Sequence, residues 1–200
     1  MSADVVIVDS GGANIASLLY AFERLGADAL LTTDADTIRA ADRVLLPGVG
    51  AAGDSMQRLE DLGLVEVVRE LEQPVLGICL GMQLLAEASE EEDVACLGVI
   101  PGTVKRLEGS SQMPVPNMGW CPLHASREHA ILDGIEDGEY FYFLHSYALP
   151  VAAVTVATAE HSAPFSAIVS HENFVAAQFH PERSSKAGAR LLENFLKIAA

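Results

Sequence analysis

The segment Pro74-Val-Leu-Gly-Ile-Cys-Leu-Gly-Met-Gln83 decides the fold. Pro74–Ile78 is a short apolar run of the kind that forms a buried strand, and Leu80–Ala88 has the composition of a helix. A strand that leads directly into a helix is the repeating unit of α/β proteins with a parallel sheet. The junction falls at Cys79, so this segment predicts both the fold class and the place of a functional side chain.

The chain before this segment repeats the same pattern. A helix is expected from about Asn14 to Leu25, and another should begin at an N-cap at Asp54 and break at Gly63. Continuous apolar strands separated by helices indicate a parallel sheet covered by helices on both faces. Three further apolar runs predict its other strands: Asp4–Asp9, Ala27–Leu31 and Arg43–Leu46.

The second half of the chain has a different sequence pattern. Its strand-like segments are closely spaced and separated by turn residues, which predicts antiparallel strands that extend the first sheet or form another. A helix at Ser184–Ala199 closes the chain. With 200 residues, half of them hydrophobic, we expect a single α/β domain over residues 1–200, with a central, mostly parallel sheet and helices on both faces. The strand-like segments are Val99–Leu107, Met118–Leu123, Tyr140–Leu144, Ala153–Thr158, Phe165–Ser170 and Phe174–Phe179.

Composition excludes several classes of function. A net charge of −16 with only 12 Lys and Arg disfavours binding to nucleic acid, because phosphate binding needs a basic surface. The first residues, Met1–Asp9, have no basic region, and their apolar run is too short to cross a bilayer. Three cysteines cannot all pair, and none has metal-ligand spacing. We therefore expect a cytoplasmic protein with no metal, no other cofactor and no membrane contact.

The strand–helix junction has the composition of a turn that presents a catalytic nucleophile. Gly77 and Gly81 stand two residues before and after Cys79, and small residues permit the sharp turn that lifts a side chain clear of the sheet. The amides and positive dipole end of the following helix favour a thiolate. The alternative is a buried structural cysteine, but glycine on both sides favours a nucleophile. Cys96 and Cys121 lack this setting and are expected to be structural.

A cysteine nucleophile needs an imidazole to accept its proton and a carboxylate to fix the imidazole tautomer. His180 ends the apolar segment Phe174–Phe179, and α/β folds place catalytic groups at strand ends. Pro181 stiffens the step to Glu182, so that the carboxylate can reach back to the imidazole. These residues predict a triad with Cys79. Four other histidines stand in polar or turn-like stretches and are expected at the surface: His124, His129, His161 and His171.

Together, Gly77–Gln83 and Gln178–Glu182 resemble the motifs of the triad-type, class I glutamine amidotransferases. The resemblance implies a flavodoxin-like fold, a γ-glutamyl thioester on Cys79 and release of ammonia. Within that family the chain is similar to the glutaminase subunits of imidazole glycerol phosphate synthase, which belong to histidine biosynthesis. The segments that carry this similarity cover nearly the whole chain: Leu46–Gly50, Val115–Trp120, Tyr142–Tyr147 and Gln178–Ser185.

The resemblance also assigns roles around the nucleophile. Gln83 would contact the substrate glutamine, and Ser146 and Tyr147 would hold its α-amino-acid end largely through backbone groups. The amide of Leu80, at the start of a helix, is a natural first donor to the oxyanion. A second donor is expected from the loop that ends at Gly50, whose preceding peptide could rest with its carbonyl inward and flip when a partner binds its ligand.

The similarity further implies a partner, a cyclase subunit with a (β/α)8 barrel that forms a heterodimer with this chain and consumes the ammonia. Two segments depart from the usual pattern. Ser10 and Ala13 replace an aromatic residue and a glycine, and Asn117 stands where histidine is usual. Both segments are expected to face the partner. Trp120 is expected to anchor the interface, although packing into the core of this chain is the alternative. The residues expected at the interface are Asn14, Pro116, Asn117, Met118 and Trp120.

Two other functions remain open from the sequence. One is the glutaminase of another synthase, such as that for anthranilate or pyridoxal phosphate, but those relatives usually have Gly-Gly where Val49-Gly50 stands. The other is a non-catalytic module that only binds a partner. A complete set of Cys79, His180 and Glu182 argues against that second reading, because binding alone does not need all three.

Overall fold

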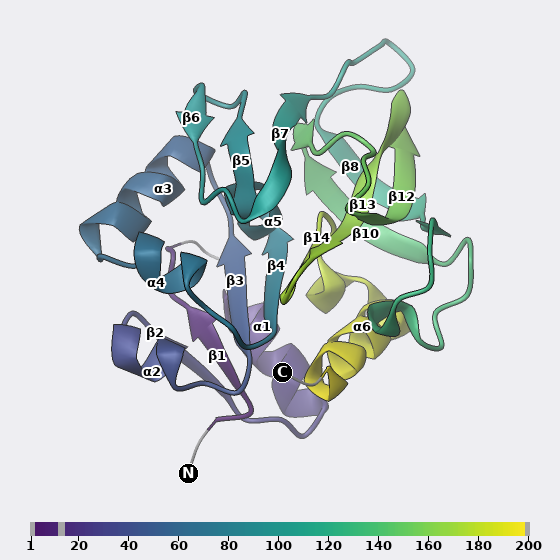
Figure 1. The fold of residues 1–200 in the computed structure, drawn as a ribbon. Helices are drawn as coiled ribbons and strands as arrows, with labels where there is room; N and C mark the ends of the chain where they lie inside the picture. Colours follow the sequence, from purple (N-terminus) through teal and green to yellow (C-terminus); the bar gives the residue numbers. More distant parts are fainter. Residues whose placement is uncertain (1–2, 12–14, 199–200) are drawn as a thin grey trace.

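The structure is a computed structural model that describes residues 3–11 and 15–198 (Figure 1). Within that part of the chain, eight strands form the main sheet in the order β2-β1-β3-β4-β14-β13-β12-β9. The pairings from β2 to β14 are parallel, and those from β14 to β9 are antiparallel. The bounds are β1 Val5–Val8, β2 Ala29–Thr32, β3 Val44–Gly48, β4 Val75–Cys79, β9 His124–Ala125, β12 Thr155–His161, β13 Ala163–His171 and β14 Phe174–Ala177.

Helices cover both faces of this sheet. Alternate residues of β1 belong to different cores: Val5 and Ile7 pack with α1 and α6, whereas Val6 and Val8 pack with α2 to α5. Strands buried on both faces must be apolar throughout, which is why the runs predicted from the sequence have no polar alternation. The predicted α/β fold is therefore confirmed. The helices are α1 Ile15–Arg24, α2 Ala35–Arg39, α3 Ala52–Asp61, α4 Val65–Arg69, α5 Leu80–Leu85 and α6 Ser185–Lys197.

Two smaller sheets stand beside the main one. β8 and β10 pair antiparallel, and the other small sheet has the order β11-β7-β5-β6. Phe141 and Phe143 of β10 are fully buried in the core that α1 and α6 share. The antiparallel half of the chain therefore both extends the main sheet and forms separate ones. The bounds are β5 Ala86–Ser89, β6 Val94–Ala95, β7 Ile100–Arg106, β8 Asn117–Pro122, β10 Tyr140–His145 and β11 Tyr147–Ala148, with 3-10 helices η1 Ala130–Leu132 and η2 Pro181–Arg183.

Two helix ends differ from the prediction. The helix after Cys79 ends at Leu85 and not at Ala88, because Ala86 is extended and pairs with Ile100 as part of β5. The predicted N-cap at Asp54 is also wrong, since α3 begins earlier, at Ala52. The short helix α2, which the apolar pattern did not indicate, is capped by Asp34, whose carboxylate accepts a hydrogen bond from the Thr37 amide.

The cap of α3 comes from elsewhere in the chain. Carboxylates of Glu91 and Glu92 accept hydrogen bonds from the amides of Ala52 and Gly53, at 2.9 and 3.0 Å. These acids lie between β5 and β6, so a tertiary contact satisfies amides that are usually satisfied by a residue next to the helix. A short-range sequence pattern cannot reveal such a cap.

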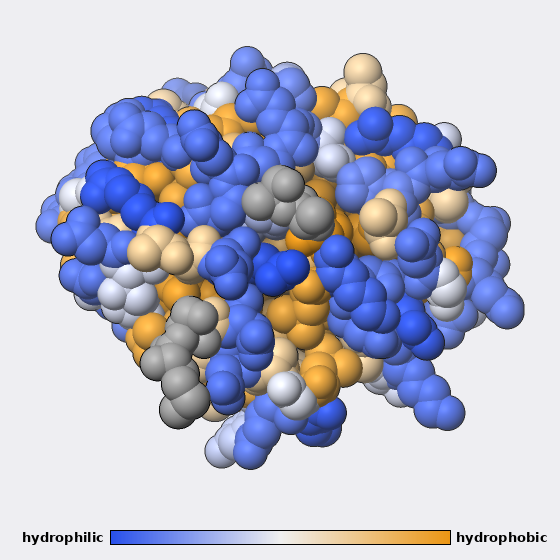
Figure 2. Space-filling view, turned by 60° about the horizontal axis from the view of Figure 1, so that its bottom comes forward, coloured by the Kyte–Doolittle hydropathy of each residue, from blue (hydrophilic) through white to orange (hydrophobic). Residues whose placement is uncertain are grey.

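Figure 2 shows the lower end of the molecule as drawn in Figure 1. Hydrophilic residues cover most of this face, and hydrophobic residues appear between them in smaller patches. This fits a chain with 28 acidic residues. None of the helices in the described ranges is long and apolar enough to cross a membrane.

Candidate active site

Cys79 stands at a strained turn between β4 and α5. Its backbone has φ 55° and ψ −111°, a conformation that costs a side-chain-bearing residue roughly 1–3 kcal/mol and that clusters at functional sites. The glycines nearby are required by close packing. A Cβ added at Gly81 would lie 1.9 Å from the Leu46 carbonyl oxygen, and one at Gly48 would lie 2.6 Å from the Gly81 nitrogen. The turn is thus held tightly against β3, with the thiol at the carboxyl end of the sheet.

His180 and Glu182 follow β14, the neighbour of β4 in the sheet. The His180 amide donates to the Tyr142 carbonyl, which fixes the segment, and Nδ1 of His180 lies 2.9 Å from Oε1 of Glu182. Both side chains are buried, with 8% and 1% of their surface exposed. Because Glu182 occupies Nδ1, Nε2 is the nitrogen left for the thiol of Cys79. The structure therefore brings the three predicted triad residues together.

The surroundings of His180 favour its protonated form. Burial alone would lower the pKa of the imidazole, but its hydrogen bonds to Cys79 and Glu182 outweigh burial and raise the pKa to about 10. A side chain that must take the proton of a thiol and hold it beside a carboxylate needs this kind of environment.

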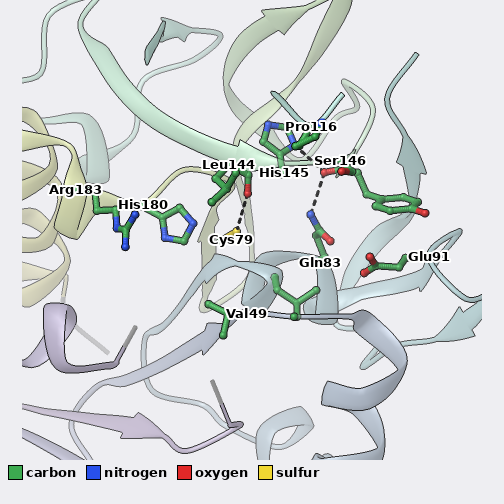
Figure 3. Close-up of a pocket in the computed structure, with 13 residues that line it drawn as sticks. Val49, Cys79, Gln83, Glu91, Pro116, Leu144, His145, Ser146, His180 and Arg183 are labelled. Carbon is green, nitrogen blue, oxygen red and sulfur yellow. Dashed lines mark hydrogen bonds between the residues drawn. The ribbon is translucent and has the colours of Figure 1, made fainter. Parts of the chain in front are cut away.

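A cavity of about 320 Å³ opens at this junction (Figure 3). This is a suitable size for a small metabolite. In the view of Figure 3, Cys79 lies in the middle, with His180 and Arg183 on one side and Gln83 and Glu91 on the other. The lining residues include most of the predicted site: Val49, Gly50, Cys79, Leu80, Gln83, Glu91, Pro116, Leu144, His145, Ser146, Tyr147, His180 and Arg183.

The residues predicted to hold glutamine share one wall. Gln83 donates through Nε2 to the Tyr147 carbonyl at 2.9 Å and to Oε1 of Gln178 at 3.1 Å. With both amide hydrogens engaged, Oε1 of Gln83 remains as an acceptor. Ser146 and Tyr147 line the cavity on the same wall. This wall therefore presents acceptors to a ligand, as a site for a primary ammonium group should.

The predicted oxyanion loop lies beside the nucleophile. Gly48 of β3 pairs with Cys79 of β4, so the residues that follow β3 reach the cavity. Gly50 has φ +97°, the region that favours glycine. The loop is anchored before this point, because the Ser10 hydroxyl donates to the Pro47 carbonyl at 2.8 Å. It is anchored after it by the acidic cap of α3 described above.

Several residues of the cavity were not predicted from the sequence. Glu91 contributes a carboxylate and Arg183 a guanidinium, and the Leu144 carbonyl accepts a hydrogen bond from the Cys79 thiol at 3.7 Å. Arg183 follows the predicted triad acid directly and could have been proposed from that position. Glu91 lies in an acidic run that looks like solvent-exposed surface, so only the folded structure identifies it.

The residues expected at a partner surface separate into two groups. Pro116 is exposed, and so are Met118 and Trp120, with 68% and 50% of their surface accessible, so Trp120 is not packed into the core. Asn117 is only 3% exposed and Ser10 only 2%, so the expectation that they face a partner is wrong. Asn117 lies on the inner side of β8, and the Ser10 hydroxyl binds the Pro47 carbonyl in the predicted oxyanion loop. Asn14 and Ala13 lie outside the described residues.

The other two cysteines and the four histidines expected at the surface are not among the residues that line the cavity. Burial raises the pKa of the Cys96 thiol to about 11, and it also raises the pKa of Cys121. Of the histidines expected at the surface, His124 is exposed and the other three are partly buried. Among the residues the structure describes, no group of three or more His, Cys, Asp or Glu side chains is placed to hold a metal ion.

Comparison with known proteins agrees with this geometry. Residues 6–199 match the family described as "Glutamine amidotransferase class-I". The chain is 51% identical, over 98% of both chains, to "Imidazole glycerol phosphate synthase subunit HisH" of Xanthomonas axonopodis pv. citri. It is 47% identical to the subunit of that name in Vibrio cholerae, over 99% of this chain and 100% of the relative. A crystal structure of a glutamine amidotransferase superposes with a TM-score of 0.74 at 20% identity, covering 96% of this chain and 97% of that one. The chain belongs to the class I glutamine amidotransferase family, among the HisH subunits of imidazole glycerol phosphate synthase.

Proposed function

We propose that this chain is a cytoplasmic glutaminase that hydrolyses glutamine to glutamate and ammonia at Cys79. It passes the ammonia to a cyclase subunit, a (β/α)8 barrel with which it forms a heterodimer. The products there are imidazole glycerol phosphate and aminoimidazole carboxamide ribotide. The observation that carries the proposal is Cys79 at a strained turn in a cavity that it shares with His180, itself paired with Glu182 at 2.9 Å.

The chemistry follows from the roles of these groups. His180 takes the proton of Cys79, and the sulfur attacks the carboxamide carbon of glutamine to form a tetrahedral oxyanion. Collapse of this species breaks the C–N bond, His180 returns the proton to the leaving nitrogen, and ammonia departs from a γ-glutamyl thioester. His180 then takes a proton from water, whose oxygen attacks the thioester and releases glutamate. The Leu80 amide, at the N-terminus of α5, is the first donor to the oxyanion.

Glutamine carries both of its charges at the end away from the reacting amide. Among the described residues that line the cavity, Glu91 is the one carboxylate, and its side chain points towards Gln83 in Figure 3. These two side chains offer oxygen acceptors to the α-ammonium group. Backbone groups of Ser146 and Tyr147 hold the rest of the α-amino-acid end. The carboxamide then lies at Cys79.

The proposed partner surface is continuous with this site. Met118 and Trp120 of β8 lie opposite Leu144 and Tyr142 of β10, and together with Tyr140 they form the outer face of the small sheet. Leu144 also lines the cavity, and its carbonyl contacts the thiol. A partner that covers this face would therefore lie at the mouth of the active site, where ammonia is released.

Trp120→Ala should weaken binding of the cyclase subunit by about 30-fold, the effect of removing an interface anchor worth about 2 kcal/mol. Its thermal unfolding should be close to that of the wild type, because the ring is half exposed and its ring contact is an edge-on one with Tyr142 at 6.0 Å. Titration calorimetry would measure the affinity. Tyr20→Ala is the matched control, since Tyr20 is an exposed aromatic residue of α1, and it should bind normally. A loss of stability without a loss of affinity would contradict the proposed surface.

The peptide between Val49 and Gly50 is the proposed switch. Hydrogen bonds from Ser10 on one side and to Glu91 on the other anchor its loop. The backbone can therefore rotate most easily at the peptide between these two anchors. A Cβ added at Gly50 would meet no atom within 4 Å, so substitution there acts through backbone conformation alone. The peptide would rest with its carbonyl inward and flip when the partner binds its ligand, which supplies the second oxyanion donor.

Gly50→Pro and Gly50→Ala should lower the partner-activated rate by about 10²–10³-fold, the usual loss for one oxyanion donor, and should affect the basal rate far less. The control is Gly63→Ala. Gly63 lies at a turn between α3 and α4, has φ +66°, and has no atom within 4 Å of an added Cβ. An alanine there would therefore have the same kind of backbone strain as an alanine at Gly50. Steady-state kinetics with and without the cyclase ligand would measure both rates. A Gly50→Pro variant that is still fully activated would exclude the switch.

The function itself is tested by a coupled assay. The free chain should hydrolyse glutamine slowly, and a cyclase subunit with its nucleotide ligand should raise the rate mainly through kcat. Imidazole glycerol phosphate should then form from glutamine without added ammonium. Glutamine hydrolysis whose ammonia the cyclase cannot use would favour another synthase, such as that for anthranilate or pyridoxal phosphate. No hydrolysis under any condition would leave a non-catalytic binding module.

A further inference from the structure

Strand β8 has two faces with different surroundings. Its outward side chains, Met118 and Trp120, belong to the proposed partner surface, whereas Asn117 and Cys121 point inward. Asn117 is paired with His145 in the register of β8 and β10, and both side chains are buried. A polar pair enclosed between a partner surface and an active site needs an explanation beyond packing, because burial of polar groups is costly unless they are hydrogen-bonded.

In each hydrogen bond of this pair, the donor and the acceptor can be assigned. The Tyr147 carbonyl can only accept, so Nδ1 of His145, at 2.8 Å, carries the proton. Burial lowers the pKa of His145 to about 4, so the ring is neutral and Nε2 is an acceptor. Nδ2 of Asn117 donates to it at 3.1 Å, while Oδ1 of Asn117 accepts from the Cys121 thiol at 3.7 Å. The Tyr147 carbonyl thus sets the tautomer of His145, and the Asn117 amide donates to the nitrogen that this tautomer leaves as an acceptor.

The chain of hydrogen bonds ends in the glutamine site. The Tyr147 carbonyl accepts from His145 and also from Nε2 of Gln83 at 2.9 Å. It therefore fixes both Gln83 and the segment Ser146–Tyr147, which form one wall of the cavity. A shift of β8 by a few tenths of an ångström would change the length of these bonds and hence the position of that wall.

We propose that Asn117 and His145 are positioning residues that couple the partner surface on β8 to the glutamine-binding wall at Gln83 and Tyr147. The inference rests on the proposed function, because it assumes that a partner covers Met118 and Trp120. Neither residue reacts with the substrate. Their effect is on how well glutamine is held, so they act on KM for glutamine and leave the reaction at Cys79 largely unchanged.

Two substitutions at one position separate this role from simple packing. Asn117→Leu keeps the size of the side chain and removes the donor, and Asn117→His changes the shape and restores an N–H donor to His145. In the complex, Asn117→Leu should raise KM for glutamine about tenfold, the effect of losing one buried hydrogen bond, with kcat changed less than twofold. Asn117→His should restore KM to within about twofold of the wild type. A packing role predicts the reverse order, and that order would overturn the proposal.

The control variant is Cys121→Ala, which removes the weak thiol hydrogen bond and leaves the bond between Asn117 and His145 in place. Its KM should equal that of the wild type. Coupling to the surface is tested by a double-mutant cycle: Trp120→Ala should raise KM in the wild-type background and have no further effect in Asn117→Leu. Equal effects of Trp120→Ala in both backgrounds would show that the two sites are independent.

Nitrogen NMR of His145 gives a readout that does not depend on hydrolysis. The ring should be neutral and protonated at Nδ1 in the wild type, and its Nε2 shift should move when the cyclase subunit binds. In Asn117→Leu the Nε2 shift should change and lose its response to the partner. Lack of any response in the wild type would overturn the inference even if glutamine is hydrolysed. Failure of hydrolysis with a clear response would instead contradict the proposed function.

Discussion

Cys79→Ala should lower glutamine hydrolysis by on the order of 10⁶-fold, the loss typical of an enzyme that loses its covalent nucleophile. Without the sulfur no thioester can form, and His180 has no thiol proton to accept. The fold should survive, since the side chain is small and its hydrogen bond to the Leu144 carbonyl, at 3.7 Å, is weak. Glutamate release by the complex with the cyclase subunit would measure the effect. Glutamine-dependent turnover near the wild-type rate would remove Cys79 from the mechanism.

The same variant offers an internal control. Synthesis of imidazole glycerol phosphate from added ammonium should continue in the Cys79→Ala complex, because the cyclase carries out that reaction. An electrophilic analogue of glutamine should label Cys79 in the wild type and leave Cys96 and Cys121 largely unmodified, since burial raises the pKa of both of these thiols. Equal labelling of all three would show that Cys79 is not specially activated.

The parts of the fold that the sequence predicted are those encoded by short-range patterns. The parallel strands are continuous apolar runs because helices cover both faces, and a glycine at position 81 is demanded by the close contact of α5 with β3. Both signals lie within a few residues of the feature that they specify. For that reason the parallel sheet and the strand–helix turn at Cys79 were predictable without knowledge of the rest of the chain.

The features that were missed depend on distant contacts. Glu91 is an ordinary acid in the sequence, and becomes a helix cap and a cavity residue only when the segment between β5 and β6 folds against Ala52. Asn117 was expected to face a partner, yet β8 alternates its side chains between two faces and places this one inside. Short strands such as β9 and β11 have too few residues to show an alternating pattern.

His180→Ala is expected to have the second largest effect, a loss of roughly 10²–10⁴-fold in kcat for the general base and more for the lost partner of the thiolate. The ring is buried beside Glu182, so truncation also removes one hydrogen bond from a buried carboxylate. Thermal unfolding therefore has to be measured in parallel, to separate chemistry from stability. A His180→Ala variant with normal turnover would contradict the assigned base.

Glu182→Gln should lower the rate of glutamine hydrolysis less than His180→Ala does. The amide keeps the shape of the buried side chain and can still accept from Nδ1 of His180, but it carries no charge to stabilise the imidazolium. The hydrogen bond to Glu182 is one of the causes that raise the pKa of His180 to about 10, so this pKa should fall in the variant. Loss of a charge-assisted bond corresponds to roughly 10–100-fold in rate, less than His180→Ala. The alkaline limb of the rate profile should move to lower pH, because the imidazolium now loses its proton sooner. Wild-type rates with an unshifted profile would show that Glu182 does not orient the base.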